Sequence, residues 1–216
     1  MFRIRLLLLS LLFCFGSLCG SATVLDSLLN TLSEIPAATT PENLDQKSIL
    51  CNNIAVRYQE LNEQNKARFY FLQSIAFTEE RIELENDWNA QNCYDLAYLY
   101  RNLATFESTT GNKEQSTLYI DKSESYYKRL EAQLSNEEYN AIMVEFYHSN
   151  FAMTYHRKDY EKGDLYLMKV ESMLKKTGRN SIYLAENYRF RAELLSATKN
   201  YDDGELYAEK ALQAYD

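Results

Sequence analysis

The sequence predicts an all-α protein built as an array of about four antiparallel helix pairs, with one further helix before them. Two observations lead to this fold class. The 216 residues include only six glycines and two prolines, and no Val/Ile/Thr-rich run alternates between polar and apolar residues, so strands are not favoured. Four segments also share one pattern of small residues at nearly fixed spacing, which indicates an internal repeat.

The first 22 residues have the pattern of an export signal and not of a folded element. MFRIRLLLLSLLFCFGSLCGSA has two arginines, then an apolar run from Leu6 to about Leu18, then small residues. This run is shorter than the roughly 20 residues that cross a bilayer, which disfavours a retained anchor. We therefore expect a signal peptide over residues 1–22, cleavage after Ala22, and an exported protein that is periplasmic or associated with the cell envelope. A lipoprotein acylated at Cys19 is the alternative, although Leu18 before it is bulky for such a signal.

The charge balance disfavours nucleic acid as a partner. The formal net charge is −8, and it becomes −10 without residues 1–22 because Arg3 and Arg5 are removed. An acidic surface repels phosphate backbones, so we expect no nucleic-acid binding by this chain. Membrane association is expected only through a lipidated Cys19 or a retained signal anchor.

Cys51 and Cys93 lie in helical patterns at heights that do not match, which favours two buried thiols over a disulfide.

The predicted elements follow in chain order. A leucine stripe over residues 23–35 predicts an N-terminal capping helix, which with a linker occupies residues 23–40. Thr40-Pro41-Glu42 then supplies a capping hydroxyl, a first-turn proline and a carboxylate that favours a helix N-terminus, so the repeat domain is expected over residues 41–216. Residues 135–138, SNEE, form a capping box that opens the third pair, and Thr177-Gly178 marks a helix end.

Each predicted helix pair carries three small or modest residues that let the two backbones approach. In the first, second and fourth pairs these residues are twelve and then seven positions apart, whereas in the third they are eleven and seven apart, which predicts a turn one residue shorter. The four sets are Ala55, Ala67 and Ser74; Ala104, Ser116 and Ser123; Ala152, Gly163 and Val170; and Ala192, Gly204 and Ala211.

This pattern resembles the tetratricopeptide repeat proteins. NLATFESTTGNKEQSTLYIDKS carries the small-residue sites and Gly-Asn turn of that family, and KNYDDGELYAEKAL is similar to its second helix. The resemblance covers about residues 41–216 and implies an α-solenoid, a superhelix of antiparallel pairs. Equivalent small residues are 49, 48 and 40 positions apart, against a usual period of about 34, so we expect lengthened helices.

The resemblance also implies a concave groove, lined by the first helix of each pair, that binds a peptide or protein partner. Asn, Ser and Arg side chains there are suited to hydrogen-bond a peptide backbone and its carboxylates; solvated polar side chains are the equally weighted alternative. The groove candidates are Asn52, Gln59, Arg101, Asn102, Thr105, Ser149, Asn150, His156 and Arg189, with Tyr98 and Phe146 as groove-facing aromatic residues.

No catalytic constellation is evident in the sequence. His148 and His156 are eight residues apart, which is not the spacing of a helical metal pair, and no CxxC, phosphate-binding glycine loop or nucleophile elbow occurs. We therefore expect no cofactor, no metal and no enzymatic activity, and instead a scaffold or adaptor. A sensor or scaffold portion of a longer bacterial signalling or transcription-regulatory protein is the alternative. The apolar stripe with Leu212 and Tyr215 predicts self-association, a continuation or a partner at the C-terminal helix.

Overall fold

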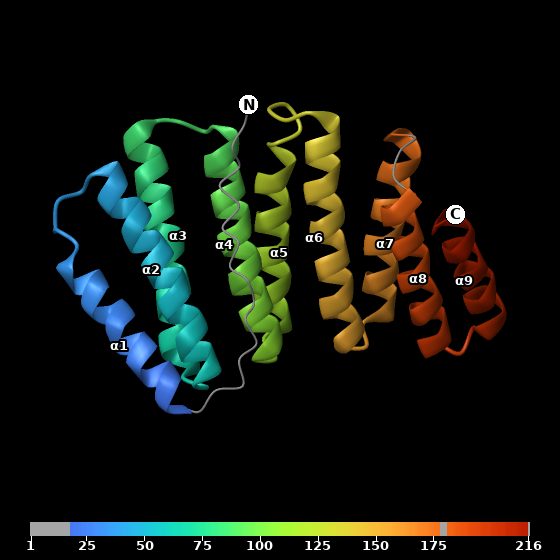
Figure 1. The fold of residues 1–216 in the computed structure, drawn as a ribbon, viewed down its shortest axis with the longest axis horizontal. Coiled ribbons are helices and arrows are strands. Elements are labelled where there is room, and N and C mark those ends of the chain that lie inside the picture. The colour runs from blue at the N-terminus through green and yellow to red at the C-terminus, as the bar shows by residue number, and fades with distance from the viewer. Residues whose placement is uncertain (1–17, 178–180, 216) are drawn as a thin grey trace. The chain divides into compact units, whose positions relative to one another are not determined.

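A computed structural model describes residues 18–177 and 181–215 of the chain (Figure 1). The regular elements of these residues are all α-helices, which confirms the predicted all-α class. They are α1 (Leu18–Glu34), α2 (Pro41–Glu60), α3 (Gln64–Glu85), α4 (Ala90–Thr109), α5 (Lys113–Lys128), α6 (Asn136–His156), α7 (Tyr160–Thr177), α8 (Ser181–Ala197) and α9 (Tyr201–Tyr215).

The chain divides into two compact units between Arg129 and Leu130. In the first unit α1 packs on α2, α2 pairs with α3, α3 packs on α4, and α4 pairs with α5. In the second unit α6 pairs with α7, α7 packs on α8, and α8 pairs with α9. Figure 1 shows the helices of each pair side by side. Most of the packing within each unit is thus between helices that are adjacent in sequence.

The helix starts follow from local capping chemistry. The side chain of Thr40 accepts a hydrogen bond from the backbone N–H of Asn43 at 3.3 Å, and Pro41 occupies the first turn of α2. Ser135 and Glu138 form both hydrogen bonds of the predicted capping box at the start of α6. Asn89, which the sequence reasoning did not single out, caps α4 by accepting from the N–H of Asn92 at 2.9 Å.

In each of the four helix pairs, the same three-residue turn joins the two helices. In the first turn the N–H of Leu61 donates to the carbonyl of Arg57, the N–H of Glu63 to that of Tyr58, and the N–H of Ala67 to that of Glu63. The corresponding bonds recur at residues 110–112, 157–159 and 198–200. The middle residue of each turn is left-handed: Asn62 (φ 58°), Gly111 (84°), Lys158 (59°) and Lys199 (65°).

The equal turns correct the predicted register of the third pair. Ala152 is exposed, and Phe151 is 2% exposed in its place, twelve residues before the buried Gly163. The third pair therefore has the same spacing as the others, and its turn is not shorter. A Cβ atom on Gly163 would lie 3.4 Å from the Phe151 ring and 3.2 Å from Thr154 Oγ1. The missing side chain of Gly163 thus makes room for the larger residue on the facing helix.

The two pairs of the first unit are held together by an apolar core and by charged contacts. Phe71, Ile75 and Ile82 of α3 share one buried cluster with residues of α4 that include Leu96 and Leu103. Burial of one such side chain contributes roughly 1.5–3 kcal/mol. This cluster is the part of the fold in which one pair covers the apolar face of the next.

A bidentate ion pair joins the same two helices. Arg68 of α3 donates two hydrogen bonds, at 2.6 and 2.8 Å, to the carboxylate of Glu107 on α4. Glu107 is 1% exposed, so loss of Arg68 would leave a buried charge without compensation.

The N-terminal predictions are only partly covered by the described residues. Residues 1–17, most of the expected signal peptide, lie outside them, and the expected cleavage after Ala22 falls within α1. Export therefore stays a prediction. Within the described part of the chain, no helix combines the length and apolar character needed to cross a membrane.

The left-handed turn residues generate a stability prediction. A side chain at positive φ costs about 1–2 kcal/mol, while glycine loses more backbone entropy on folding. Lys158→Gly and Lys199→Gly should therefore each raise the free energy of unfolding in urea by about 0.5–1 kcal/mol. Lys158→Ala shortens the side chain without adding the backbone freedom of glycine, so it is the matched control. Equal stabilities of the Gly and Ala variants would contradict the left-handed assignment.

Candidate functional site

Two of the predicted groove residues in the first unit bind each other. Asn102 on α4 donates from Nδ2 to Oδ1 of Asn52 on α2, at 3.1 Å. Asn52 is only 6% exposed, so this amide pair bridges the first helices of two neighbouring pairs. Its main role is therefore to tie α2 to α4, and Asn102 is the member with more access to a ligand.

The other candidates of the first unit are more accessible. The guanidinium of Arg101 lies 5.2 Å from the centre of the Tyr98 ring in a cation–π contact, and Thr105, four residues further along α4, is exposed. The Thr105 hydroxyl donates to the backbone carbonyl of Arg101 at 3.0 Å. Gln59 is half-buried one turn further along α2 than Val56, which is 37% exposed.

The second unit separates its candidates into surface and core residues. Ser149 and His156 are exposed on α6, but Asn150 and Phe146 are 0% exposed. Contrary to expectation, Asn150 and Phe146 thus do not line a surface groove. For Asn150 the register correction gives the reason, since the residue before Phe151 corresponds to the buried Leu103 and not to Asn102.

Arg189 is the predicted residue that the structure places at a cavity. It is half exposed on α8, forms an ion pair with Glu193 at 2.5 Å, and stacks over the Phe190 ring at 4.3 Å. Phe190 in turn contacts His148 with a ring separation of 4.9 Å. Two contacts therefore hold the guanidinium on the surface of the second unit.

The cavity has a volume of about 840 Å³ and lies between the last two helices, α8 and α9, next to Tyr155 of α6. It is mainly apolar and is open to solvent, because Tyr201, Leu212 and Tyr215 on its border are 64%, 69% and 54% exposed. It is lined by Tyr155, Arg189, Ala192, Glu193, Ser196, Ala197, Tyr201, Gly204, Glu205, Ala208, Ala211, Leu212 and Tyr215. We call this surface the α8/α9 groove.

Sequence reasoning found Leu212, Tyr215 and Arg189 but not the aromatic side chains around them. Neither Tyr155 nor Tyr201 was among the groove candidates, and Tyr201 is largely exposed. The corrected register would have helped, because it places Tyr155 four residues after the buried Phe151 and next to the turn. The small residues Ala192, Gly204 and Ala208 make the space that these side chains border.

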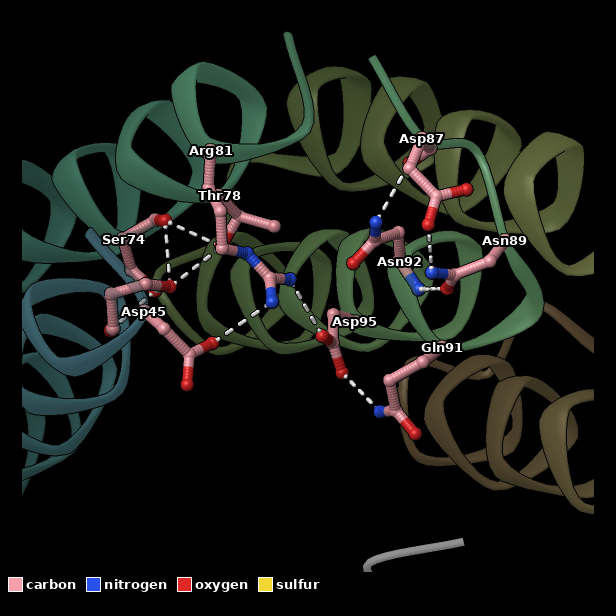
Figure 2. A network of polar contacts seen from close by, with 10 residues as sticks. Asp45, Ser74, Thr78, Arg81, Asp87, Asn89, Gln91, Asn92 and Asp95 are labelled. Carbon is pink, nitrogen blue, oxygen red and sulfur yellow. Dashed lines mark hydrogen bonds and ion pairs between the residues drawn. The ribbon is translucent and has the colours of Figure 1, made fainter. Parts of the chain in front are cut away.

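A cluster of polar and charged residues in the first unit finds its partners among its own members (Figure 2). Arg81 lies 3.2 Å from Asp45 and 3.0 Å from Asp95, and Gln91 donates to Asp95 at 2.7 Å. Burial raises the pKa of Asp95, and the bonds from Gln91 and Arg81 act against that rise. Because each of these charges has a partner from α2, α3 or α4, the cluster ties the three helices together.

Metal ligands and thiols are the remaining candidates for chemistry among the described residues. No group of three or more His, Cys, Asp or Glu side chains there could hold a metal ion. Cys51 and Cys93 are both buried and are not joined in a disulfide, and burial raises the pKa of Cys51 to about 12. A thiol that stays protonated at neutral pH is a poor nucleophile.

Comparison of the sequence with protein-family models gives no match, and comparison with curated protein sequences gives none either. The candidate site therefore rests on the sequence and the geometry of the chain.

His148 generates a prediction of pH dependence. Burial lowers its pKa, Asn187 at 3.2 Å and Glu186 oppose the shift, and Arg189 lowers the pKa further. The unfolded chain therefore binds a proton more readily than the folded chain, so the free energy of unfolding should fall as pH drops below about 6.5.

Urea titrations at several pH values between about pH 7.5 and 5 test this. The free energy of unfolding should decrease over this range by on the order of 1 kcal/mol more for the wild type than for His148→Gln. The exposed His156→Gln is the matched control and should follow the wild type. Parallel pH profiles for His148→Gln and the wild type would contradict a buried neutral imidazole.

Proposed function

We propose that this protein is a non-catalytic interaction module, a scaffold or adaptor, that binds a helical segment of a partner protein in the α8/α9 groove. We further propose that its helix pairs are tetratricopeptide-like, that they form a solenoid, and that the protein acts after export. The observation that carries the binding proposal is the exposure of Tyr215 at a position that the other helix pairs bury, together with the exposure of Leu212, whose counterpart in the first pair is buried.

Counting from the left-handed turn residue makes the four pairs comparable. Leu212 lies thirteen residues after Lys199, as Ile75 lies thirteen after Asn62, yet Ile75 is 4% exposed and Leu212 is 69% exposed. Three positions further on, the other pairs have Thr78, Tyr127 and Leu174 at 2%, 1% and 5% exposure, whereas Tyr215 is 54% exposed.

In the first unit the cover over this face is a helix. Residues of α4 pack on the apolar face of α3 that contains Ile75. The matching face of α9 is thus shaped for a helix with apolar residues at i, i+3 or i+4, and i+7, which is the helix-in-groove mode of recognition. The cavity volume of about 840 Å³ gives space for the side chains of such a helix.

Polar groups at the rim would orient the bound helix. Arg189 and Glu193 form one ion pair at the edge of the groove, and Glu205 stands on α9 across from it. Rim charges of this kind contribute to specificity and association rate more than to affinity. The affinity would come from burial of Leu212, Tyr215 and Tyr201, and tyrosine is one of the residue types that dominate interface energies.

A displayed library of random amphipathic helices tests this proposal on the purified chain. Selected clones should carry apolar residues at helical spacing. Leu212→Asp and Tyr215→Asp should each weaken their binding by at least about tenfold. Leu118→Asp, at an exposed leucine of the first unit, is the matched control and should leave binding unchanged. Failure to enrich any helix, or clones that bind both groove variants like the wild type, would overturn the proposal.

A further inference from the structure

A large apolar residue is exposed at the same position in every helix pair, seven residues after the left-handed turn residue. The four are Phe69, Leu118, Leu165 and Leu206, with exposures of 54%, 47%, 54% and 46%. Packing within the pairs does not explain why this residue is apolar, because the fold leaves its side chain exposed in every pair. Exposed apolar side chains that recur on one face indicate an interaction surface.

The residues that follow are also repeated, and they do pack. A tyrosine comes directly after each exposed apolar residue, and in three pairs a lysine comes three residues later. In the second unit the rings of Tyr147 and Tyr166 are 6.1 Å apart and those of Tyr188 and Tyr207 are 5.7 Å apart. The tyrosine that follows each exposed leucine thus packs on a tyrosine of the facing helix.

In the second unit both outer helices carry charges in the same order. Glu161 lies four residues before Leu165 and Lys169 four after it; Asp202 and Lys210 flank Leu206 in the same way. Residues four apart share one face of a helix. The ammonium of Lys169 lies 4.9 Å from the Tyr147 ring centre, and that of Lys210 lies 4.3 Å from the Tyr207 ring centre. Each helix thus presents a fixed acid, leucine, lysine sequence.

A cavity of about 520 Å³ separates these two stripes. Glu161 and Asp164 of α7 and Leu206, Tyr207 and Lys210 of α9 are among the residues that line it, over α8. This cavity is distinct from the α8/α9 groove, since it includes residues of α7 and none of Arg189, Leu212 or Tyr215. A leucine side chain from another molecule is small enough to insert there.

We propose that this outer face of α7 and α9 is a self-association surface that binds a second copy of the chain across a two-fold axis. Figure 1 shows α7 and α9 running in the same direction, so a two-fold axis would set each antiparallel to a helix of the second copy. Glu161 and Asp202 would then face the lysines of the other copy, and leucine would face leucine. The surface is self-complementary in charge, which selects a second copy over an unrelated partner.

The expected dimer is weak. Glu209 on α9 stands where α7 has the exposed Met168, and it adds like charge to the interface. We therefore expect a dissociation constant on the order of micromolar. The first unit does not have two helices with the order acid, apolar residue, lysine, because α3 has the uncharged Asn65 and Gln73 four residues before and after Phe69. Self-association should accordingly depend on the second unit.

Sedimentation of the full chain at concentrations from on the order of 1 to 300 µM tests the apolar part of the surface. Leu165→Glu combined with Leu206→Glu should weaken dimerisation by at least about tenfold, with helix content unchanged by circular dichroism. Leu118→Glu, the same repeat position in the first unit, should not weaken it. A monomer at every concentration, or a dimer that the double variant leaves intact, would overturn the proposal.

A charge-swap experiment tests the two-fold arrangement. Glu161→Lys with Asp202→Lys makes one variant, and Lys169→Glu with Lys210→Glu makes the other. Each should dimerise less than the wild type because like charges meet, and their equimolar mixture should restore a heterodimer. A mixture that associates no better than its components would overturn the antiparallel pairing. Leu212→Glu, which tests the α8/α9 groove, should leave dimerisation unchanged; its loss would place the dimer in that groove and overturn this proposal.

Discussion

The close crossing of two helices within each pair is the constraint on which the rest of the structure depends. A three-residue turn with one left-handed residue fixes a twelve-residue spacing between the facing positions of the two helices. The second-helix position is occupied by Ala67, Ser116, Gly163 or Gly204, all of them buried. Protein interiors are close-packed, so the side chain opposite must have a volume that complements this small residue.

Once the crossing is fixed, the outer parts of the helices are free to differ. The helices described range from 15 residues in α9 to 22 in α3, and the added turns carry contacts between pairs. In the first unit these contacts are the shared apolar cluster, the Arg68–Glu107 ion pair and the Arg81 network of Figure 2. The chain therefore uses one local geometry for each pair and different side-chain chemistry to join neighbouring pairs.

The same geometry explains the proposed binding surfaces. The helix crossing leaves one apolar face of each second helix outside the pair. The next helix can cover this face, as α4 covers α3, or the face remains exposed, as the α9 face with Leu212 does. The outer position of Phe69, Leu118, Leu165 and Leu206 is never covered. The α8/α9 groove fits a helix because a helix covers the corresponding face of α3. The outer face of α7 and α9 fits a second copy of itself because its charges alternate in sign.

Sequence reasoning identified the four pairs and the capping residues of α2 and α6, since these depend on local chemistry. It misplaced the third pair by one residue because it looked for two small residues, whereas Phe151 and Gly163 reach the same combined packing with one large and one absent side chain. It also could not place Asn52, because the residue that bonds to it, Asn102, lies fifty positions away. The burial of a polar side chain depends on such distant partners, and a pattern along one helix does not show them.

The central claim, that complementary volumes set each crossing, is tested most directly by a double-mutant cycle at the third pair. Gly163→Ala introduces a methyl group 3.4 Å from the Phe151 ring, and Phe151→Ala opens a cavity at the same place. Urea denaturation should show that the double variant, which recreates the Ala55 and Ala67 combination, is more stable than the sum of the single effects by at least about 1 kcal/mol. Additive losses would contradict the claim.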